Sequence, residues 1–244
     1  MKPLYILFIA MFLMLTGCES EPFQEEGLIS QETLMLTRND VRESNVGVRV
    51  DLFTQVFGGF FERRAGNTQG SGVVFFEDET YYYVLTNFHV VNPRDYDRAS
   101  YQLSPSFESS PIEAELYVFD ETKDLAVIRF EKGNLELKVM NLNRRLNEPL
   151  VPGEFLLAVG NPSAINSIVT YGEYLDLVSI RDVDFKVIMH NALIFPGNSG
   201  GALTDINGNL VGLNTWRFQS DEDLNLAIPL ETIQTFLNSH DLWH

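Results

Sequence analysis

Short apolar runs alternate with polar turn residues over most of the chain, from about residue 45 onward. Valine, isoleucine, phenylalanine and tyrosine dominate the runs, whose lengths are those of β-strands. Representative runs are SGVVFFEDETYYYVLTNFHVV, EAELYVFD, DLAVIRFE, EFLLAVG, KVIMHNALIF and NLVGLNTW, separated by turn clusters such as GNP, EKGN and DINGN. Many short strands with regular turns predict an all-β protein built as an antiparallel sandwich or as barrels.

Helical spacing is found in one segment, PLETIQTFLNSH, close to the end of the sequence. Its apolar residues recur three and four positions apart, at Leu230, Ile233, Phe236 and Leu237. This period predicts a short C-terminal helix with one buried face.

The stretch DLFTQVFGGFFERRAGNTQG, residues 51–70, breaks the strand pattern. Phe53, Phe57, Phe60 and Phe61 gather there beside two glycines and two arginines. We expect a loop, and loops run over the surface, so this one is unusually aromatic. Its rings either pack under another loop or form an interaction surface.

The first residues, MKPLYILFIAMFLMLTGCES, have the features of an exported protein's leader. Lys2 precedes an apolar run from Leu4 to Leu15, which is short for a membrane span but typical of a signal peptide. The ending LTGC resembles a bacterial lipobox, which would make Cys18 the lipidated first residue of the mature protein. Because Cys18 is also the only cysteine, no internal disulfide can form. The alternative is an uncleaved anchor with an incidental thiol.

These features divide the chain into three segments. We expect a lipoprotein signal peptide over residues 1–17, an acidic tether or arm over 18–44, and a folded domain over 45–244. A tethered protein of this kind would work in the bacterial cell envelope. Glu19 follows the cysteine where enteric bacteria use aspartate as an inner-membrane retention signal, so we expect the outer membrane, facing the periplasm.

The charge balance excludes one class of partner. Lys and Arg number 17 against 34 Asp and Glu, giving a net charge of −17. So acidic a surface repels phosphate backbones, and no basic stripe offsets it, so we expect no nucleic-acid binding. The sequence suggests no cofactor and no metal.

The stretch PGNSGGAL, residues 196–203, carries the strongest chemical signal. Glycines on both sides of Ser199 fit either a surface turn or a nucleophile whose neighbouring amides must face a developing oxyanion. GNSGG also matches the G-x-S-x-G elbow of α/β-hydrolases, but that fold needs a helix after the serine. A hairpin pattern with the turn NGN follows instead, so the elbow interpretation fails.

A serine nucleophile needs a base, and the chain has four histidines: His89, His190, His240 and His244. The last two lie in a polar end and are expected to be solvated, and His190 lies in a strand as a packed side chain. His89 ends an apolar run, at the foot of a strand where a rigid element can hold it. We therefore choose His89.

The base in turn needs a carboxylate to hold its tautomer. Asp124 heads the apolar run DLAVIRF, so its side chain is expected to point inward, where a buried carboxylate requires a partner. Asp120 is the second choice because it lies in a polar turn.

The order His89, Asp124, Ser199 and the strings TNFHVV, DLAVIRF and PGNSGGAL resemble the HtrA/DegP branch of the chymotrypsin-like serine proteases. GSGVVF, VGNP, LVGLNTW and LNLAIP fall where that branch has comparable strings, so the resemblance runs from about residue 45 to 230. It implies two six-stranded antiparallel β-barrels with a catalytic His–Asp–Ser triad in the cleft between them.

The resemblance also implies further site residues. The backbone N–H groups of Gly197 and Ser199 would form the oxyanion hole, and Gly200 and Gly201 would allow the two barrels to approach closely. The substrate pocket would be lined by Leu193, Ile194, Thr215, Trp216 and Arg217.

Three residues depart from the pattern of relatives. Asn198 stands where digestive relatives carry an aspartate that pairs with a new N-terminus, so activation by cleavage is not expected. Phe195 and Asn191 stand where HtrA relatives have a small polar residue and an aspartate. We expect Phe195 to bias the oxyanion loop through packing against the phenylalanines of residues 53–61, within one chain or from a neighbouring subunit.

The sequence therefore predicts a membrane-anchored serine endopeptidase that hydrolyses envelope proteins and forms homo-oligomers. HtrA-type proteases usually carry PDZ domains after the protease unit, and we expect none here. The alternative function is an anchored protein-binding or sensor module on a protease scaffold, with little turnover, since a fold does not guarantee a function.

Overall fold

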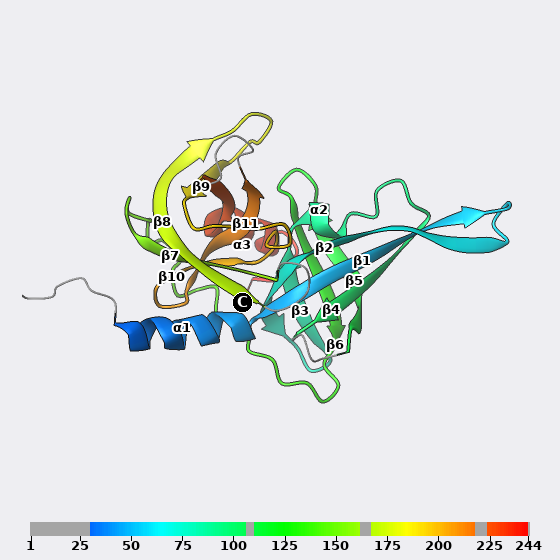
Figure 1. Cartoon of the computed structure of the whole chain (residues 1–244), viewed down its shortest axis with the longest axis horizontal. Coiled ribbons are helices and arrows are strands. Elements are labelled where there is room, and N and C mark those ends of the chain that lie inside the picture. The colour runs from blue at the N-terminus through cyan, green and yellow to red at the C-terminus, as the bar shows by residue number, and fades with distance from the viewer. Residues whose placement is uncertain (1–29, 106–109, 162–166, 218–223, 244) are drawn as a thin grey trace, which may run out of the picture. The chain divides into compact units, whose positions relative to one another are not determined.

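The computed structural model describes residues 30–105, 110–161, 167–217 and 224–243. Two closed antiparallel barrels make up most of this part of the chain (Figure 1). The helices are α1 (Gln31–Glu43), α2 (Phe88–Val91) and α3 (Leu230–Asn238). The strands are β1 (Asn45–Val56), β2 (Phe61–Glu77), β3 (Tyr81–Thr86), β4 (Arg98–Ser104), β5 (Ile112–Asp120), β6 (Leu125–Glu131), β7 (Phe155–Gly160), β8 (Ile168–Ser179), β9 (Lys186–His190), β10 (Ala202–Asp205), β11 (Leu210–Arg217) and β12 (Asn225–Pro229).

Each barrel contains six strands. Barrel 1 has the order β1-β2-β3-β6-β5-β4 and closes through pairing of β4 with β1, whereas barrel 2 has the order β10-β11-β12-β9-β8-β7 and closes through β7 with β10. Closure removes the exposed strand edges that an open sheet would present. The predicted all-β class, the two six-stranded barrels and the C-terminal helix are confirmed.

Three apolar clusters hold the barrels together. One fills barrel 1 and another fills barrel 2, as expected from alternate strand residues pointing inward. The third combines Leu85 and Val127 of barrel 1 with Leu157 and Leu213 of barrel 2, and it also includes Phe236 of α3. The two barrels and the C-terminal helix are therefore parts of one packed unit.

Helix α1 lies within the segment assigned to a tether. Residues 31–43 are helical and bury Thr37 and Val41, and Val41 belongs to the cluster shared by the two barrels. The sequence signal was weak because most of the helix is polar or exposed, including the apolar residues Met35 and Leu36. The ordered domain therefore begins before residue 45.

No helix in the described ranges is long and apolar enough to cross a membrane. The proposed leader and Cys18 lie outside those ranges.

The aromatic stretch of residues 51–70 is strand, not the loop that we expected. It forms the paired ends of β1 and β2, with Val56 opposite Phe61, and this hairpin extends well beyond the barrel (Figure 1). The alternation failed as a signal there because a two-stranded ribbon outside the barrel has no buried face.

Candidate active site

His89 lies in the short helix α2, which directly follows β3. The sequence placed it at the foot of a strand, but the strand ends at Thr86 and a helical turn carries the imidazole. Asp124 makes this turn possible: the Phe88 N–H donates to its backbone carbonyl (3.1 Å), and the His89 N–H donates to its carboxylate Oδ1 (2.8 Å). The N–H groups at the start of a helix need such external acceptors.

The other carboxylate oxygen of Asp124 holds the imidazole. Asp124 Oδ2 lies 2.7 Å from His89 Nδ1 and also accepts a hydrogen bond from Thr215 Oγ1 at 3.0 Å. Because an ionised carboxylate only accepts, Nδ1 carries the hydrogen and Nε2 is left with its lone pair. The His89 side chain is 43% exposed and that of Asp124 only 14%, so the ring is supported from inside and open to a substrate.

Asp120, our second choice for the carboxylate, has a different role. Its carboxylate accepts hydrogen bonds from the backbone N–H groups of Thr122 and Lys123 and pairs with the Lys123 ammonium. Partial burial acts to raise its pKa, but the hydrogen bonds from Lys123 and Thr122 outweigh this and lower the pKa to about 2. Asp120 therefore holds the turn that precedes Asp124, whose own backbone is left-handed (φ 54°).

Ser199 follows a tight turn in barrel 2. The Asn198 N–H donates to the Phe195 carbonyl (2.9 Å), Pro196 occupies the second position, and Gly197 has φ 102°. These are the features of a type II β-turn, which requires a positive φ at its third residue. Among the described residues, the N–H groups of Gly197 and Ser199 have no acceptor, so both remain available to a ligand.

The hydroxyl of Ser199 is not bonded to His89 in this state. Within the described ranges its only hydrogen bond is donated to the Thr215 carbonyl, at 3.2 Å. Catalytic hydrogen bonds are often unformed in structures without substrate. Attack on a substrate would therefore require the hydroxyl to turn from Thr215 toward the imidazole.

Ser71 connects barrel 1 to the serine turn, which sequence reasoning missed. Its Oγ donates to the Gly197 carbonyl and accepts from the Asn161 N–H, both at 2.6 Å, and its N–H donates to the Ser199 carbonyl at 2.8 Å. The Ser71 carbonyl accepts from Thr86 Oγ1 at 2.7 Å. A fully buried serine thus fixes carbonyls on both sides of Asn198. Its place in GSGVVF was the only sequence signal.

The glycines after the nucleophile have separate roles. A Cβ on Gly200 would lie 2.2 Å from the Ser71 carbonyl oxygen, so this glycine allows barrel 1 to approach, as we expected. A Cβ on Gly201 would lie 2.0 Å from the Val159 carbonyl oxygen of β7, within barrel 2, so the expectation for Gly201 was wrong.

The five predicted pocket residues differ in exposure and in the contacts that they make. Leu193 is 45% exposed and remains available, and Trp216 and Arg217 lie at the end of β11. Ile194, however, is buried in the core of barrel 2, and the Thr215 hydroxyl is committed to Asp124. Neither side chain is therefore free to bind a substrate.

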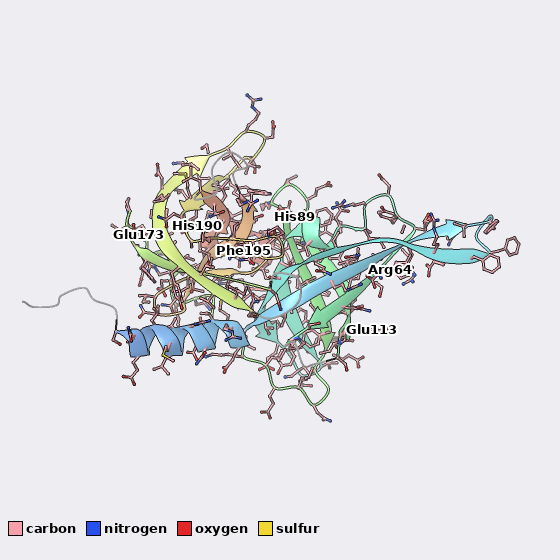
Figure 2. The ribbon with its side chains drawn as sticks, in the orientation of Figure 1. Arg64, His89, Glu113, Glu173, His190 and Phe195 are labelled. Carbon is pink, nitrogen blue, oxygen red and sulfur yellow. The ribbon has the colours of Figure 1, made fainter. Side chains whose placement is uncertain are left out.

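The three residues that depart from the relatives are each packed differently. Asn198 is fully buried, and a Cβ on Gly160 would lie 2.5 Å from its Cγ. Asn191 accepts a hydrogen bond from the Glu173 N–H at 2.6 Å. Phe195 is 45% exposed and lies where the barrels meet, whereas Arg64 marks the distant hairpin (Figure 2). The expected packing of Phe195 on the phenylalanines of residues 53–61 is thus not made within the chain.

The other histidines are not placed to act as bases. His190 is fully buried in β9, and this burial lowers its pKa to about 4. His240 Nδ1 lies 2.9 Å from the Phe236 carbonyl oxygen within the C-terminal turn, and His244 lies outside the described residues. The described ranges also contain no group of three His, Cys, Asp or Glu side chains placed to hold a metal ion.

Comparison with known proteins gives matches over most of the chain. Residues 70–213 match the model of the trypsin-like peptidase domain. The serine protease HTRA1 of Xenopus tropicalis is 33% identical over 201 residues, covering 80% of this chain and 40% of the relative. The serine protease HTRA3 of Homo sapiens is 31% identical over 185 residues, covering 72% of this chain and 39% of the relative. The chain thus spans about two fifths of the length of these relatives.

A solved structure gives the same match in three dimensions. The crystal structure of the serine endoprotease from Yersinia pestis superposes with a TM-score of 0.63 at 28% sequence identity, covering 88% of this chain and 67% of that one. The likeness therefore extends to both barrels.

Proposed function

The chain belongs to the trypsin-like peptidases of the HtrA type, and from this premise we propose that it hydrolyses peptide bonds in proteins with Ser199 as nucleophile. The observation that carries the proposal is the bond of 2.7 Å between His89 Nδ1 and Asp124 Oδ2, which leaves Nε2 as the base for the serine. Thr215 connects this pair to the nucleophile, because its hydroxyl donates to Asp124 and its carbonyl accepts from Ser199 Oγ.

The reaction proceeds in two displacement steps. Ser199 Oγ attacks the substrate carbonyl carbon while its proton passes to His89 Nε2, and the electron pair of the carbonyl moves onto its oxygen. The N–H groups of Gly197 and Ser199 stabilise this oxyanion. Its collapse breaks the C–N bond as His89 returns the proton to the leaving amine, and water repeats the sequence on the acyl-enzyme.

Asp124 keeps the His89 ring in the tautomer and orientation that a base for Ser199 needs. It holds the tautomer with hydrogen on Nδ1, and it stabilises the imidazolium that forms when Nε2 takes the serine proton. The Thr215 hydroxyl and the His89 N–H each donate to the carboxylate and so fix its plane. The imidazole therefore does not need to reorient during the reaction.

Labelling with a fluorophosphonate tests this proposal, because an activated serine attacks its phosphorus, displaces fluoride and is left as a stable phosphonate ester. We expect the full-length protein to be labelled at a single residue, and we expect Ser199→Ala to abolish labelling. Ser179→Ala, a substitution of an exposed serine at the end of β8, serves as the matched control and keeps full labelling. Equal labelling of the parent and Ser199→Ala would overturn the proposal.

The bond from Ser199 Oγ to the Thr215 carbonyl favours a second candidate, a protein-binding or sensor module with little turnover. If the serine stays on Thr215, partners bind in the cleft but are not cleaved. Peptide turnover distinguishes the two functions: a rate equal to that of Ser199→Ala with retained peptide binding supports the sensor.

We also propose that the chain is a lipid-anchored protein of the bacterial envelope, in the outer membrane facing the periplasm, which cleaves envelope proteins as a homo-oligomer. The support for the anchor is the sequence LTGC after a short apolar run. Metabolic labelling with a fatty acid tests it: Cys18→Ser should remove the label and leave the precursor unprocessed. Label that persists on Cys18→Ser would contradict the anchor.

A further inference from the structure

The far end of the β1–β2 hairpin is separate from the barrel. Beyond Phe53, which lies opposite Arg98, β1 has no pairing with β4, so residues 54–63 form a ribbon of two strands. Figure 1 shows this ribbon extending away from barrel 1 into open space. An isolated two-stranded ribbon is marginal in water unless something else supports it.

The base of the ribbon is held by charged side chains. Arg98 donates two hydrogen bonds of 2.7 Å to the Glu62 carboxylate, and its guanidinium lies 4.0 Å from the ring centre of Phe53. Arg64, on the same strand as Glu62, binds Asp51 at 2.5 Å. The ribbon is thus fixed in its outward direction by contacts that reach as far as Glu62 and leave the three phenylalanine rings free.

The tip itself carries three phenylalanines that pack on nothing behind them. Phe57, Phe60 and Phe61 are 80%, 86% and 66% exposed, which makes them the three most exposed large apolar side chains of the described residues. Phe57 and Phe61 contact each other edge to face, with ring centres 6.1 Å apart. Burial of apolar surface stabilises a fold, so these rings contribute almost nothing to folding of this chain.

The turn at the tip contains an unfavourable backbone conformation. Phe57 has φ 52°, in the left-handed region that a residue with a Cβ adopts only at a cost, and Gly58 and Gly59 follow with φ 69° and 92°. No burial within the chain compensates for this conformation. An interaction outside the chain would.

The local charge is balanced, unlike that of the whole protein: Arg63 and Arg98 stand against Glu62 and Asp97, and Asp97 accepts hydrogen bonds from Thr54 and Gln55 of the ribbon. Arg63 is exposed, two residues after Phe61 in β2, and it has no ion-pair partner among the described residues. Glu62, the one acidic residue at the tip, is neutralised by Arg98. The tip is therefore an aromatic surface with one free cation on a protein of net charge −17.

We propose that this tip, residues 57–63, inserts into the interfacial region of a lipid bilayer that contains anionic lipids. The three rings enter the boundary between headgroups and acyl chains, and the Arg63 guanidinium binds lipid phosphates. An acidic protein is repelled from such a membrane over most of its surface, so the outward ribbon lets this tip reach the bilayer while the acidic surfaces stay at a distance.

The size of the tip favours lipid over a protein partner. Three phenylalanine side chains, exposed by two thirds or more, offer roughly 300–650 Å² together, which is below the ~800 Å² per partner of a stable protein interface. A bilayer needs no complementary pocket, so a narrow tip can insert. The proposal does not depend on catalysis or on lipidation of Cys18.

Fluorescence quenching of a tryptophan at the tip tests the proposal. Full-length Phe60→Trp is reconstituted in vesicles of phosphatidylcholine and phosphatidylglycerol whose acyl chains carry bromine, and the signal of the parent with Trp216 and Trp243 is subtracted. All variants share the same N-terminal segment, so a difference in quenching between them reports the position of the tryptophan. The matched control is Val151→Trp, at an apolar residue that is 63% exposed in a loop.

We expect quenching at position 60 to exceed quenching at position 151 by about threefold or more, with a blue-shifted emission. Arg63→Glu in the Phe60→Trp protein should reduce this quenching on anionic vesicles and leave it unchanged on pure phosphatidylcholine. Thermal unfolding at the parent's midpoint shows that each variant is folded. Equal quenching at the two positions overturns the proposal, and so does a blue shift that depends on protein concentration without vesicles, which identifies a second copy of the chain as the occupant.

Discussion

The two barrels contribute unequally to the active site. In barrel 1 the hydrogen bonds among α2, Asp124 and His89 are complete, with both carboxylate oxygens occupied. In barrel 2 the serine turn leaves two N–H groups without an acceptor among the described residues, and the nucleophile is bonded to a carbonyl. The half that orients the base is finished before substrate arrives, whereas the half that meets the substrate is left open.

This difference follows from what each half must do. The imidazole has to keep one tautomer and one direction throughout the reaction, which complete hydrogen bonding ensures. The oxyanion donors stabilise the transition state only if no internal group already occupies them. Substitutions in the half that orients the base and in the half that meets the substrate should therefore lower the rate by different factors.

The largest effect is expected from removing the nucleophile or its base. His89→Ala and Ser199→Ala should each lower kcat by about 10⁶, and the double variant should be no worse, because the two residues act as one unit. Steady-state hydrolysis of a peptide by the three variants measures this. His240→Ala, outside the site, is the control and should keep the parent's rate, and additive losses in the double variant would contradict a shared mechanism.

A smaller loss of kcat is expected when Asp124 is replaced by a residue of the same shape that cannot carry the charge. Asp124→Asn places an amide next to Nδ1 and favours the wrong tautomer, so kcat should fall by about 10⁴. Asp120→Asn is the matched control, since that carboxylate belongs to the neighbouring turn and contacts Lys123 and Thr122. Comparable losses in kcat for the two variants would mean that the turn, not the carboxylate–imidazole bond, is responsible.

The serine turn of barrel 2 is held by Ser71 of barrel 1, so replacing Ser71 should lower the rate. Ser71→Ala removes the hydrogen bond to the Gly197 carbonyl, and kcat should fall by about 10–100-fold, less than the 10²–10³ that follows loss of an oxyanion donor. Affinity for a peptide boronate, which mimics the tetrahedral intermediate, should fall by the same factor while KM stays within about twofold.

The control for Ser71 is another buried serine. Ser44 is 1% exposed, and its Oγ donates to the Val41 carbonyl at 3.3 Å, away from the site. Ser44→Ala should lower the free energy of unfolding by a similar amount, about 1 kcal/mol, without changing boronate affinity. If both variants lose boronate affinity equally, Ser71 acts through stability alone.

The smallest effect on catalysis, but a clear one on stability, is expected at His190 of barrel 2. Burial lowers its pKa from 6.5 to about 4, so below pH 6.5 the unfolded chain binds a proton that the folded chain does not. The contribution of His190 to the free energy of unfolding should therefore be at its maximum above pH 6.5. It should fall as the pH drops toward 4, by about 3 kcal/mol in total.

Urea unfolding of the parent and His190→Gln at several pH values checks this. The curve of free energy against pH should be steeper for the parent between pH 6.5 and 4. Should His190→Gln fail to fold, NMR titration of the His190 ring in the parent replaces it, and a pKa near 6.5 would contradict the prediction.

Local patterns predicted most of the fold because most strands are short apolar runs that turn residues separate, with at least one face buried in a barrel. The failures lie where this condition does not hold. The ribbon of residues 54–63 has no buried face, and α1 buries only Thr37 and Val41. The run YYYVLTNFHVV is buried over nearly its whole length, polar residues included, so no period marks the change from β3 to α2.

The candidate site was predictable only in part, for a related reason. Ser199 lies in a distinctive local string, and His89 and Asp124 each lie beside an apolar run. The contacts from Thr215 to Asp124 and from Ser71 to Gly197 join residues 91 and 126 positions apart. Such pairs depend on how the two barrels pack, which no local pattern records.

The bond between Ser71 and Gly197 also bears on when the protein can first act. During synthesis the chain emerges from its N-terminal end, so barrel 1 is complete while the strands that carry the nucleophile are still missing. Even a folded second barrel would lack its support until it docked on the first. The last step of folding is then also the step that arms the enzyme, and an immature chain is protected from cleaving its neighbours or itself.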